Sequence, residues 1–166
     1  SVAILRVFTE RLIAEHPQVV LITGDLTKDG EMASHRFLID SCLVKLQHAG
    51  IQPLVIPGNH DVNNPHAVSF KGDTTERVPT VSAGEFAALY ADYGYGTALA
   101  RDEHSLSYVF EPAGSNLRIL AIDACKYEEN DFEKSICRHD GRIKPQTMKF
   151  IAQQVADARR EGKRII

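Results

Sequence analysis

The hydrophobic pattern of the N-terminal part of the chain predicts a helix, a strand, a second helix and a second strand, in that order. Apolar residues recur at helical spacing over residues 2–15 and again over residues 31–49. Residues 18–22 and 53–56 form largely apolar runs, which are typical of buried strands. A strand, a helix and a strand in this order predict a crossover unit whose two strands are parallel neighbours.

The middle of the chain predicts less regular structure. Residues 62–82 are rich in Asn, Pro, Gly, Asp and Thr and have no hydrophobic period, which predicts a long loop. A short helix is expected around residues 84–93. Residues 105–110 alternate polar and apolar side chains, and residues 117–122 are also strand-like, so we expect these two segments to form an antiparallel hairpin.

The C-terminal part predicts one more helix and one more strand. Asp123 follows the second strand of the hairpin, and an Asp at a strand end is expected to act as a capping or turn-forming residue more often than as a metal ligand. Residues 126–144 are charged and irregular, which predicts an exposed segment to which we assign no chemistry. Pro145 is a typical first residue of a helix and Gly162 a typical stop, so a helix is expected between them, with a strand beginning at Arg164.

Composition narrows the class of protein. The chain is long enough for one domain, its formal net charge is −3, and it has no cluster of Lys and Arg, which argues against general binding to nucleic acid or anionic membranes. No apolar run reaches the length of a membrane span, no signal peptide is visible, and the compartment stays open. The cysteines are odd in number and not closely paired, so they indicate neither a disulfide framework nor a zinc knuckle. They are Cys42, Cys125 and Cys137.

Polar residues follow both N-terminal strands. Gly24-Asp25 comes after the first strand, and Gly58-Asn59-His60-Asp61 comes after the second. Because the carboxyl ends of parallel neighbours lie on the same side, we expect Asp25, Asn59 and His60 to converge on one edge of the sheet. Carboxylate and amide oxygens suit Mn, Mg or Fe, and imidazole extends the choice to Zn. These residues alone do not supply enough donors for two metal ions.

The two segments resemble motifs of the calcineurin-like metallophosphoesterases. Gly24-Asp25 and Gly58-Asn59-His60-Asp61, with one helix between them, look like the second and third signature motifs of that family, in wording closest to bacterial cyclic-nucleotide phosphodiesterase-like members. The resemblance implies an α/β fold, a layered α/β sandwich with mixed sheets. The first, fourth and fifth motifs are missing, so we expect residues 1–166 to be part of a single domain that is truncated at both ends.

The resemblance also implies a reaction and roles for individual residues. The protein would hydrolyse phosphate esters with two divalent or transition-metal ions, Mn, Fe or Zn, which activate a hydroxide. Asp25 would bridge the two ions, Asn59 would bind one of them, and His60 would be the catalytic histidine that protonates the departing oxygen. Asp61 is expected to orient the turn or His60 rather than to bind metal.

Three questions stay open at this point. Lys28 stands where the protein Ser/Thr phosphatase branch has an Asp that orients the histidine, with Asp29 next, and this favours other branches. The expected substrate is a phosphate ester, for which a nucleotide or cyclic nucleotide is a candidate; a phosphodiester is favoured, and a phosphomonoester is the alternative. A family-like fold that serves as a binding scaffold without catalysis is a further alternative, since fold does not guarantee chemistry.

The loop after the Gly58-Asn59-His60-Asp61 segment and the other histidines supply further polar side chains. Asn63, Asn64 and His66 lie in the long loop after the second motif and are candidates to face a substrate, because loops of this length are commonly functional. A solvated connector is the alternative for this loop. The other histidines fall on helices or polar loops and are expected to face solvent: His16, His35, His48, His104 and His139.

Overall fold

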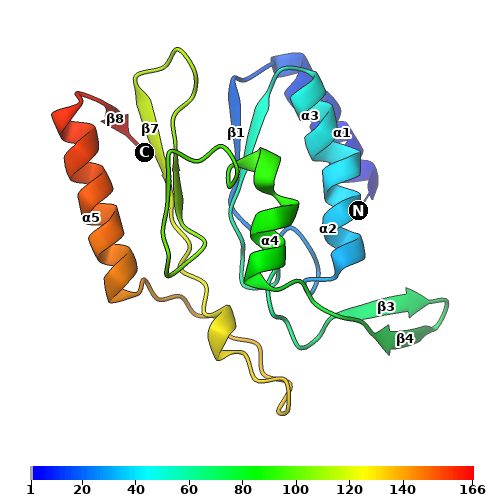
Figure 1. Cartoon of the computed structure of the whole chain (residues 1–166). Coiled ribbons are helices and arrows are strands. Elements are labelled where there is room, and N and C mark those ends of the chain that lie inside the picture. Colours follow the sequence, from blue (N-terminus) through cyan, green and yellow to red (C-terminus); the bar gives the residue numbers. More distant parts are fainter. Residues whose placement is uncertain (1) are drawn as a thin grey trace.

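The computed structural model describes residues 2–166, and of Lys71 the backbone alone. Figure 1 shows helices on both sides of two sheets, so the chain forms a layered α/β sandwich, as predicted. The elements, with η for 3-10 or π-helical segments, are α1 Val2–Glu15, β1 Val19–Ile22, α2 Met32–Leu38, η1 Ile39–Leu43, α3 Val44–His48, β2 Gln52–Val55, β3 Val68–Lys71, β4 Thr74–Arg77, α4 Ala83–Leu89, η2 Ala91–Tyr93, β5 Ala100–Arg101, β6 Tyr108–Phe110, β7 Leu117–Ala121, η3 Tyr127–Glu129, α5 Pro145–Arg160 and β8 Arg164–Ile165.

The first sheet confirms the predicted crossover unit. Strands β1 and β2 pair in parallel, with Val19 opposite Gln52 and Ile22 opposite Val55. The helix between them is continuous, and a π-helical segment joins α2 to α3. The apolar side chains that it buries are Cys42, Leu43 and Leu46, and α1 packs against η1 and α3. The carboxyl ends of β1 and β2 therefore lie next to each other.

The second sheet has the strand order β5-β6-β7-β8 and is mixed. The predicted hairpin is present as the antiparallel pair β6 and β7, and the last strand, β8, pairs with β7 in parallel. Helix α5 covers this sheet (Figure 1). The Tyr108 hydroxyl on β6 donates a hydrogen bond of 3.0 Å to the carbonyl oxygen of Val55 on β2, so the two sheets are also joined by a polar contact.

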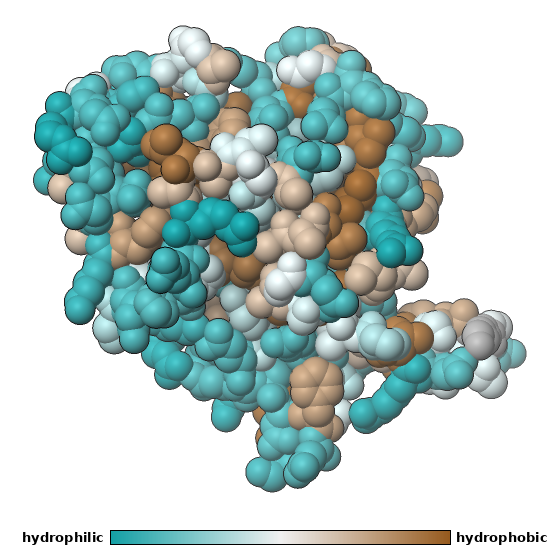
Figure 2. All heavy atoms as spheres, in the orientation of Figure 1, coloured by the Kyte–Doolittle hydropathy of each residue, from teal (hydrophilic) through white to brown (hydrophobic). Residues whose placement is uncertain are grey.

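The prediction of an unstructured loop over residues 62–82 is wrong in part, because β3 and β4 form an antiparallel hairpin there. It projects from the body of the molecule (Figures 1 and 2). Strand β4 is exposed along its whole length, so no burial requirement imposes a hydrophobic alternation on it. Gly72-Asp73 is a typical sequence for a two-residue hairpin loop, and Gly72 has the positive φ, +62°, that such a loop requires.

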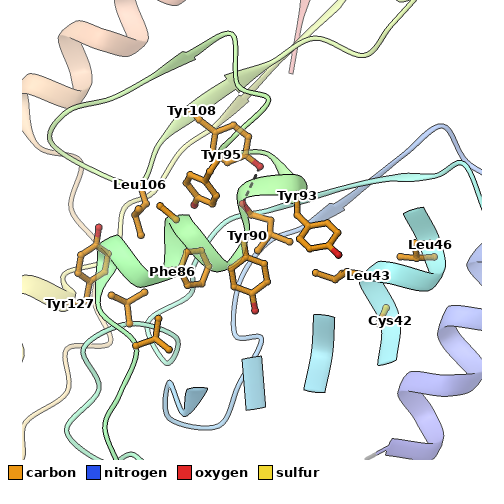
Figure 3. Close-up of a cluster of buried hydrophobic side chains, with 14 of the residues drawn as sticks. Cys42, Leu43, Leu46, Phe86, Tyr90, Tyr93, Tyr95, Leu106, Tyr108 and Tyr127 are labelled. Carbon is orange, nitrogen blue, oxygen red and sulfur yellow. Dashed lines mark hydrogen bonds between the residues drawn. The ribbon is translucent and has the colours of Figure 1, made fainter. Parts of the chain in front are cut away.

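Aromatic side chains from α4, the following turn and β6 form part of the buried core. The rings of Phe86 and Tyr90 are 4.6 Å apart, and those of Tyr95 and Tyr108 are 4.8 Å apart (Figure 3). Ser82 begins α4 with a reciprocal capping box to Glu85, which fixes the start of the helix. Hydrophilic residues predominate on the face shown in Figure 2. Within residues 2–166, no helix combines the length and apolar character needed to cross a bilayer.

His35 is buried, which corrects the expectation that it faces solvent. Its Nε2 donates to the backbone oxygen of Asp61 at 3.0 Å, and its Nδ1 accepts from the Tyr90 hydroxyl at 2.7 Å. Burial is the main reason that the pKa of His35 is lowered, because a charged imidazolium would lose its hydration. The neutral ring thus links the Gly58-Asn59-His60-Asp61 turn to Tyr90 of the aromatic core.

This burial predicts a pH-dependent stability. The unfolded chain takes up a proton on His35 below about pH 6.5, whereas the folded protein resists it, so the free energy of unfolding falls as the pH drops below that value. The contribution is at most about 1.4 kcal/mol per pH unit. Urea unfolding of the full chain between pH 7.5 and 5.5 measures it. His35→Gln should flatten the slope, whereas Tyr90→Phe, which keeps the buried imidazole, should retain it; equal slopes in His35→Gln and wild type would contradict the prediction.

Candidate active site

The turns that follow β1 and β2 are in direct contact. A Cβ atom built on Gly58 would lie 2.2 Å from Oδ1 and 2.3 Å from the backbone nitrogen of Asp25. A Cβ atom built on Gly24, whose φ is +95°, would lie 2.4 Å from the backbone nitrogen of Gly58. Glycine is therefore required at both positions for the close approach. The structure brings Asp25 beside the Gly58-Asn59 turn, where the parallel strands were expected to place it.

This contact predicts the effect of one added methyl group. Gly58→Ala should lower the free energy of unfolding by about 1–3 kcal/mol, because the new Cβ meets backbone atoms that cannot move cheaply. It should also reduce phosphoesterase turnover, because the Asp25 carboxylate is displaced. Gly84→Ala is the matched control: its Cβ meets nothing within 4 Å, and a helical Ala is expected to be neutral or to stabilise by about 0.4–1 kcal/mol. Urea unfolding and turnover test both, and a wild-type-like Gly58→Ala would contradict the prediction.

Asp61 holds the two turns together. Its side chain is fully buried, and Oδ1 accepts hydrogen bonds from the backbone nitrogens of Leu26 and Thr27, at 2.8 and 2.9 Å, and from the Thr27 hydroxyl at 3.0 Å. Oδ2 accepts from the backbone nitrogen of Gly58 at 2.8 Å. The carboxylate therefore accepts hydrogen bonds from residues of both turns. The geometry agrees with an orienting role for Asp61.

His60 is held through one ring nitrogen. Its Nδ1 donates to the backbone oxygen of Lys28 at 2.7 Å and lies 3.4 Å from Oδ1 of the buried Asp29. With Nδ1 as the donor, Nε2 is left for another partner, and 37% of the side chain is exposed. The hydrogen bond from the Lys28 ammonium to Asp29 raises the pKa of Lys28, so this side chain stays charged.

This geometry corrects the argument drawn from Lys28. The sequence has Lys at the position where the protein Ser/Thr phosphatase branch has Asp, which favours other branches. Asp29, one residue further on, nevertheless lies beside the His60 ring. The substitution at position 28 therefore does not remove a carboxylate from the histidine, and it does not separate one branch of the family from another.

Residues 126–144, expected to form an exposed segment without assigned chemistry, lie against the Gly58-Asn59-His60-Asp61 turn. Nδ2 of Asn59 is 2.9 Å from Nδ1 of His139, and the rings of His139 and His60 are 5.8 Å apart. His139 is exposed, as expected, but it also contacts two residues of the predicted site. No local pattern signals this contact, because His139 stands alone in an irregular stretch. Asp123, by contrast, accepts from the backbone nitrogen of Cys125 at 2.9 Å, which confirms the turn-forming role predicted for it.

The three candidates of the loop after the second motif have different surroundings. Asn63 has a φ of +49°, and its backbone oxygen accepts from Nδ2 of Asn130 at 3.0 Å. Nε2 of the exposed His66 lies 2.9 Å from the backbone oxygen of Ser135. Asn64 is buried, and its Nδ2 donates to the backbone oxygen of His60 at 3.3 Å, so it supports the motif instead of facing a substrate.

The donors available for a metal are oxygen atoms. Within residues 2–166 no hydrogen bond or ion pair engages the Asp25 carboxylate, and the bond to His139 uses the nitrogen of the Asn59 amide and leaves its oxygen free. Both residues line a cavity of about 460 Å³ between the two sheets, together with apolar side chains and Cys125. The described residues contain no group of three or more His, Cys, Asp or Glu able to hold an ion. Asp25 and Asn59 thus fit part of a coordination sphere.

The cysteines are free, as expected from their spacing. Burial, followed by the nearby Asp123 carboxylate, raises the pKa of Cys125 to about 12. Burial also raises the pKa of Cys137. Burial therefore favours the neutral thiol over the thiolate at both positions.

Comparison with known proteins agrees with this site. The family model described as "Calcineurin-like phosphoesterase" matches residues 2–160. The match spans nearly the whole chain, so the chain belongs to the calcineurin-like phosphoesterase family. It is accordingly a metal-dependent phosphoesterase, a hydrolase that acts on phosphate esters. No curated protein matches the chain.

Proposed function

We propose that this protein hydrolyses phosphodiesters at a binuclear metal centre to which Asp25 and Asn59 contribute, with His60 as the catalytic histidine. The observation that supports the proposal is the contact of the Asp25 turn with the Gly58-Asn59 turn, together with the cavity that both Asp25 and Asn59 line. The oxygen donors of these residues suit Mn or Fe, and Zn when imidazoles join them. The family resemblance implies further donors from motifs other than these two.

Each protein group has a distinct part in the proposed reaction. Metal ions, when bound, supply charge stabilisation for the phosphate and lower the pKa of water from about 15.7 toward neutrality. His60 keeps Nδ1 on the Lys28 carbonyl and so presents Nε2 to the substrate, where its proton passes to the departing oxygen. Oδ1 of Asp29 lies 3.4 Å from Nδ1 and helps to hold the ring in this orientation. Asp61 positions the turn that carries His60 and does not touch the substrate.

The choice between diester and monoester is tested with paired substrates. Bis-p-nitrophenyl phosphate and p-nitrophenyl phosphate are assayed in parallel with the full-length protein and added Mn²⁺. We expect kcat/KM to be higher for the diester, and we expect EDTA to abolish both activities and Mn²⁺ to restore them. Equal or greater monoester turnover would overturn the diesterase proposal while leaving the phosphoesterase assignment intact.

Metal content separates this proposal from a non-catalytic scaffold. Elemental analysis of the intact protein, purified without chelators, is expected to find two transition-metal ions per chain. A chain that binds no transition metal under any loading condition would favour the scaffold. The same measurement identifies the ions among Mn, Fe and Zn.

A further inference from the structure

Residues 125–142, named here the 125–142 arm, pack on the turn that carries Asn59. The Cys125 thiol lies 3.5 Å from the backbone oxygen of Pro57, and the Cys137 thiol lies 3.7 Å from the backbone oxygen of Asn59. Nδ2 of Asn130 donates to the backbone oxygen of Asn63 at 3.0 Å. The arm therefore contacts the chain at Asn59 and on both sides of it, although the arm has little regular structure.

The arm holds His139 in place through its neighbours in the chain. The backbone nitrogen of Arg138 donates to the Asn130 side chain at 2.8 Å. Asp140 forms an ion pair of 2.8 Å with Lys126, at the other end of the arm. An isolated β-bridge between Cys125 and Gly141 closes the base of the arm. The neighbours of His139 on both sides are thus held by contacts within the arm, which limits where its ring can lie.

The chemistry of the Asn59–His139 bond fixes which way the amide points. The amide nitrogen has only hydrogens to offer, so Nδ1 of His139 accepts and its proton sits on Nε2. With its nitrogen committed to His139, Asn59 directs Oδ1 away from that ring. An amide without such a partner is free to rotate and to present its nitrogen, which cannot bind a cation.

We propose that His139 is a positioning residue for Asn59: it accepts a hydrogen bond from the amide nitrogen, holds Oδ1 toward the metal site and so raises metal affinity. The inference rests on the proposed function, in which Asn59 is a metal ligand. Groups that orient metal ligands in this way typically contribute about 10–100-fold to metal affinity or activity. The proposal gives the 125–142 arm a role that its sequence pattern does not indicate.

Mn²⁺ binding to the full-length protein, measured by isothermal titration calorimetry, tests the proposal without relying on turnover. His139→Phe keeps a ring but has no acceptor, and we expect it to weaken Mn²⁺ binding by about 10–100-fold. His139→Ala is expected to do the same, and His139→Gln, whose amide oxygen can accept, should recover most of the affinity. His48→Phe is the matched control, because His48 is an exposed histidine at the end of α3.

A double-mutant cycle distinguishes positioning from a general loss of structure. If His139 acts through Asn59, Asn59→Ala and Asn59→Ala/His139→Phe should bind Mn²⁺ equally weakly. Additive losses would overturn the proposal, as would a His139→Phe affinity within about twofold of wild type. Equal losses in His139→Gln and His139→Phe would also overturn it, because the acceptor would then be irrelevant.

Asp25→Asn separates failure of this inference from failure of the proposed function. If Asp25→Asn loses Mn²⁺ while His139→Phe binds it normally, the metal centre stands and the positioning role falls. If the wild-type protein binds no Mn²⁺, both fall together. Far-UV circular dichroism of every variant checks that the compared proteins share the same fold.

Discussion

Replacing His60 with Gln is expected to lower kcat for phosphodiester hydrolysis by about 10²–10⁴ while Mn²⁺ binding is retained. Gln offers an amide nitrogen that can still donate to the Lys28 carbonyl, which His60 contacts at 2.7 Å, so the turn keeps its support. It has no proton to transfer near neutral pH. The loss therefore isolates the proton delivered from Nε2 to the departing oxygen.

The leaving group decides how large this loss is. A departing oxygen of low pKa, such as p-nitrophenolate, needs little help from an acid, whereas phenolate needs more. We expect the kcat ratio of wild type to His60→Gln to be near the lower end of the range for bis-p-nitrophenyl phosphate and larger for the corresponding phenyl diester. His104→Gln, an exposed histidine outside the site, serves as control. An identical loss for both leaving groups would show that His60 does not act as the general acid.

The parts of the fold that the sequence predicted correctly are regular elements, whose type is indicated by the spacing of their apolar residues. Strands β1 and β2 and the helix between them each have a face that must be apolar, so their type follows from composition. Parallel pairing then follows from the order of the elements. The meeting of Asp25 with the Gly58-Asn59 turn needed no further information, because neighbouring strand ends share one edge.

The parts that were missed depend on contacts between residues distant in the chain. His139 reaches Asn59 from an irregular segment, and its position is set by polar contacts of the 125–142 arm that leave no hydrophobic period. His35 was placed in solvent because a histidine on a helix is usually polar surface, yet Tyr90 and the backbone of Asp61 satisfy both its nitrogens. Asp29 lies beside His60 across two turns that are joined by hydrogen bonds to Asp61, a contact that no local pattern of the sequence indicates.

Asp61→Asn is expected to lower the free energy of unfolding by about 2–4 kcal/mol, because hydrogen bonds to a buried charged group are worth about 1.5–3 kcal/mol each. An amide has one acceptor oxygen. If that oxygen keeps the bonds from Leu26 and Thr27, its nitrogen faces the backbone nitrogen of Gly58, so two donors meet where a bond of 2.8 Å existed. Turnover should fall as well, since the two turns then separate and Asp25 moves away from Asn59.

Urea unfolding and turnover of the full-length protein measure both effects, with Asp73→Asn in the exposed turn of the β3–β4 hairpin as a control of equal charge change. Unchanged turnover in Asp61→Asn would refute the orienting role of this carboxylate. The variant also predicts a coupling with Gly58→Ala, because both changes strain the same contact between the turns. The double variant should lose less stability than the sum of the two single losses, since a contact that is already broken cannot be broken again.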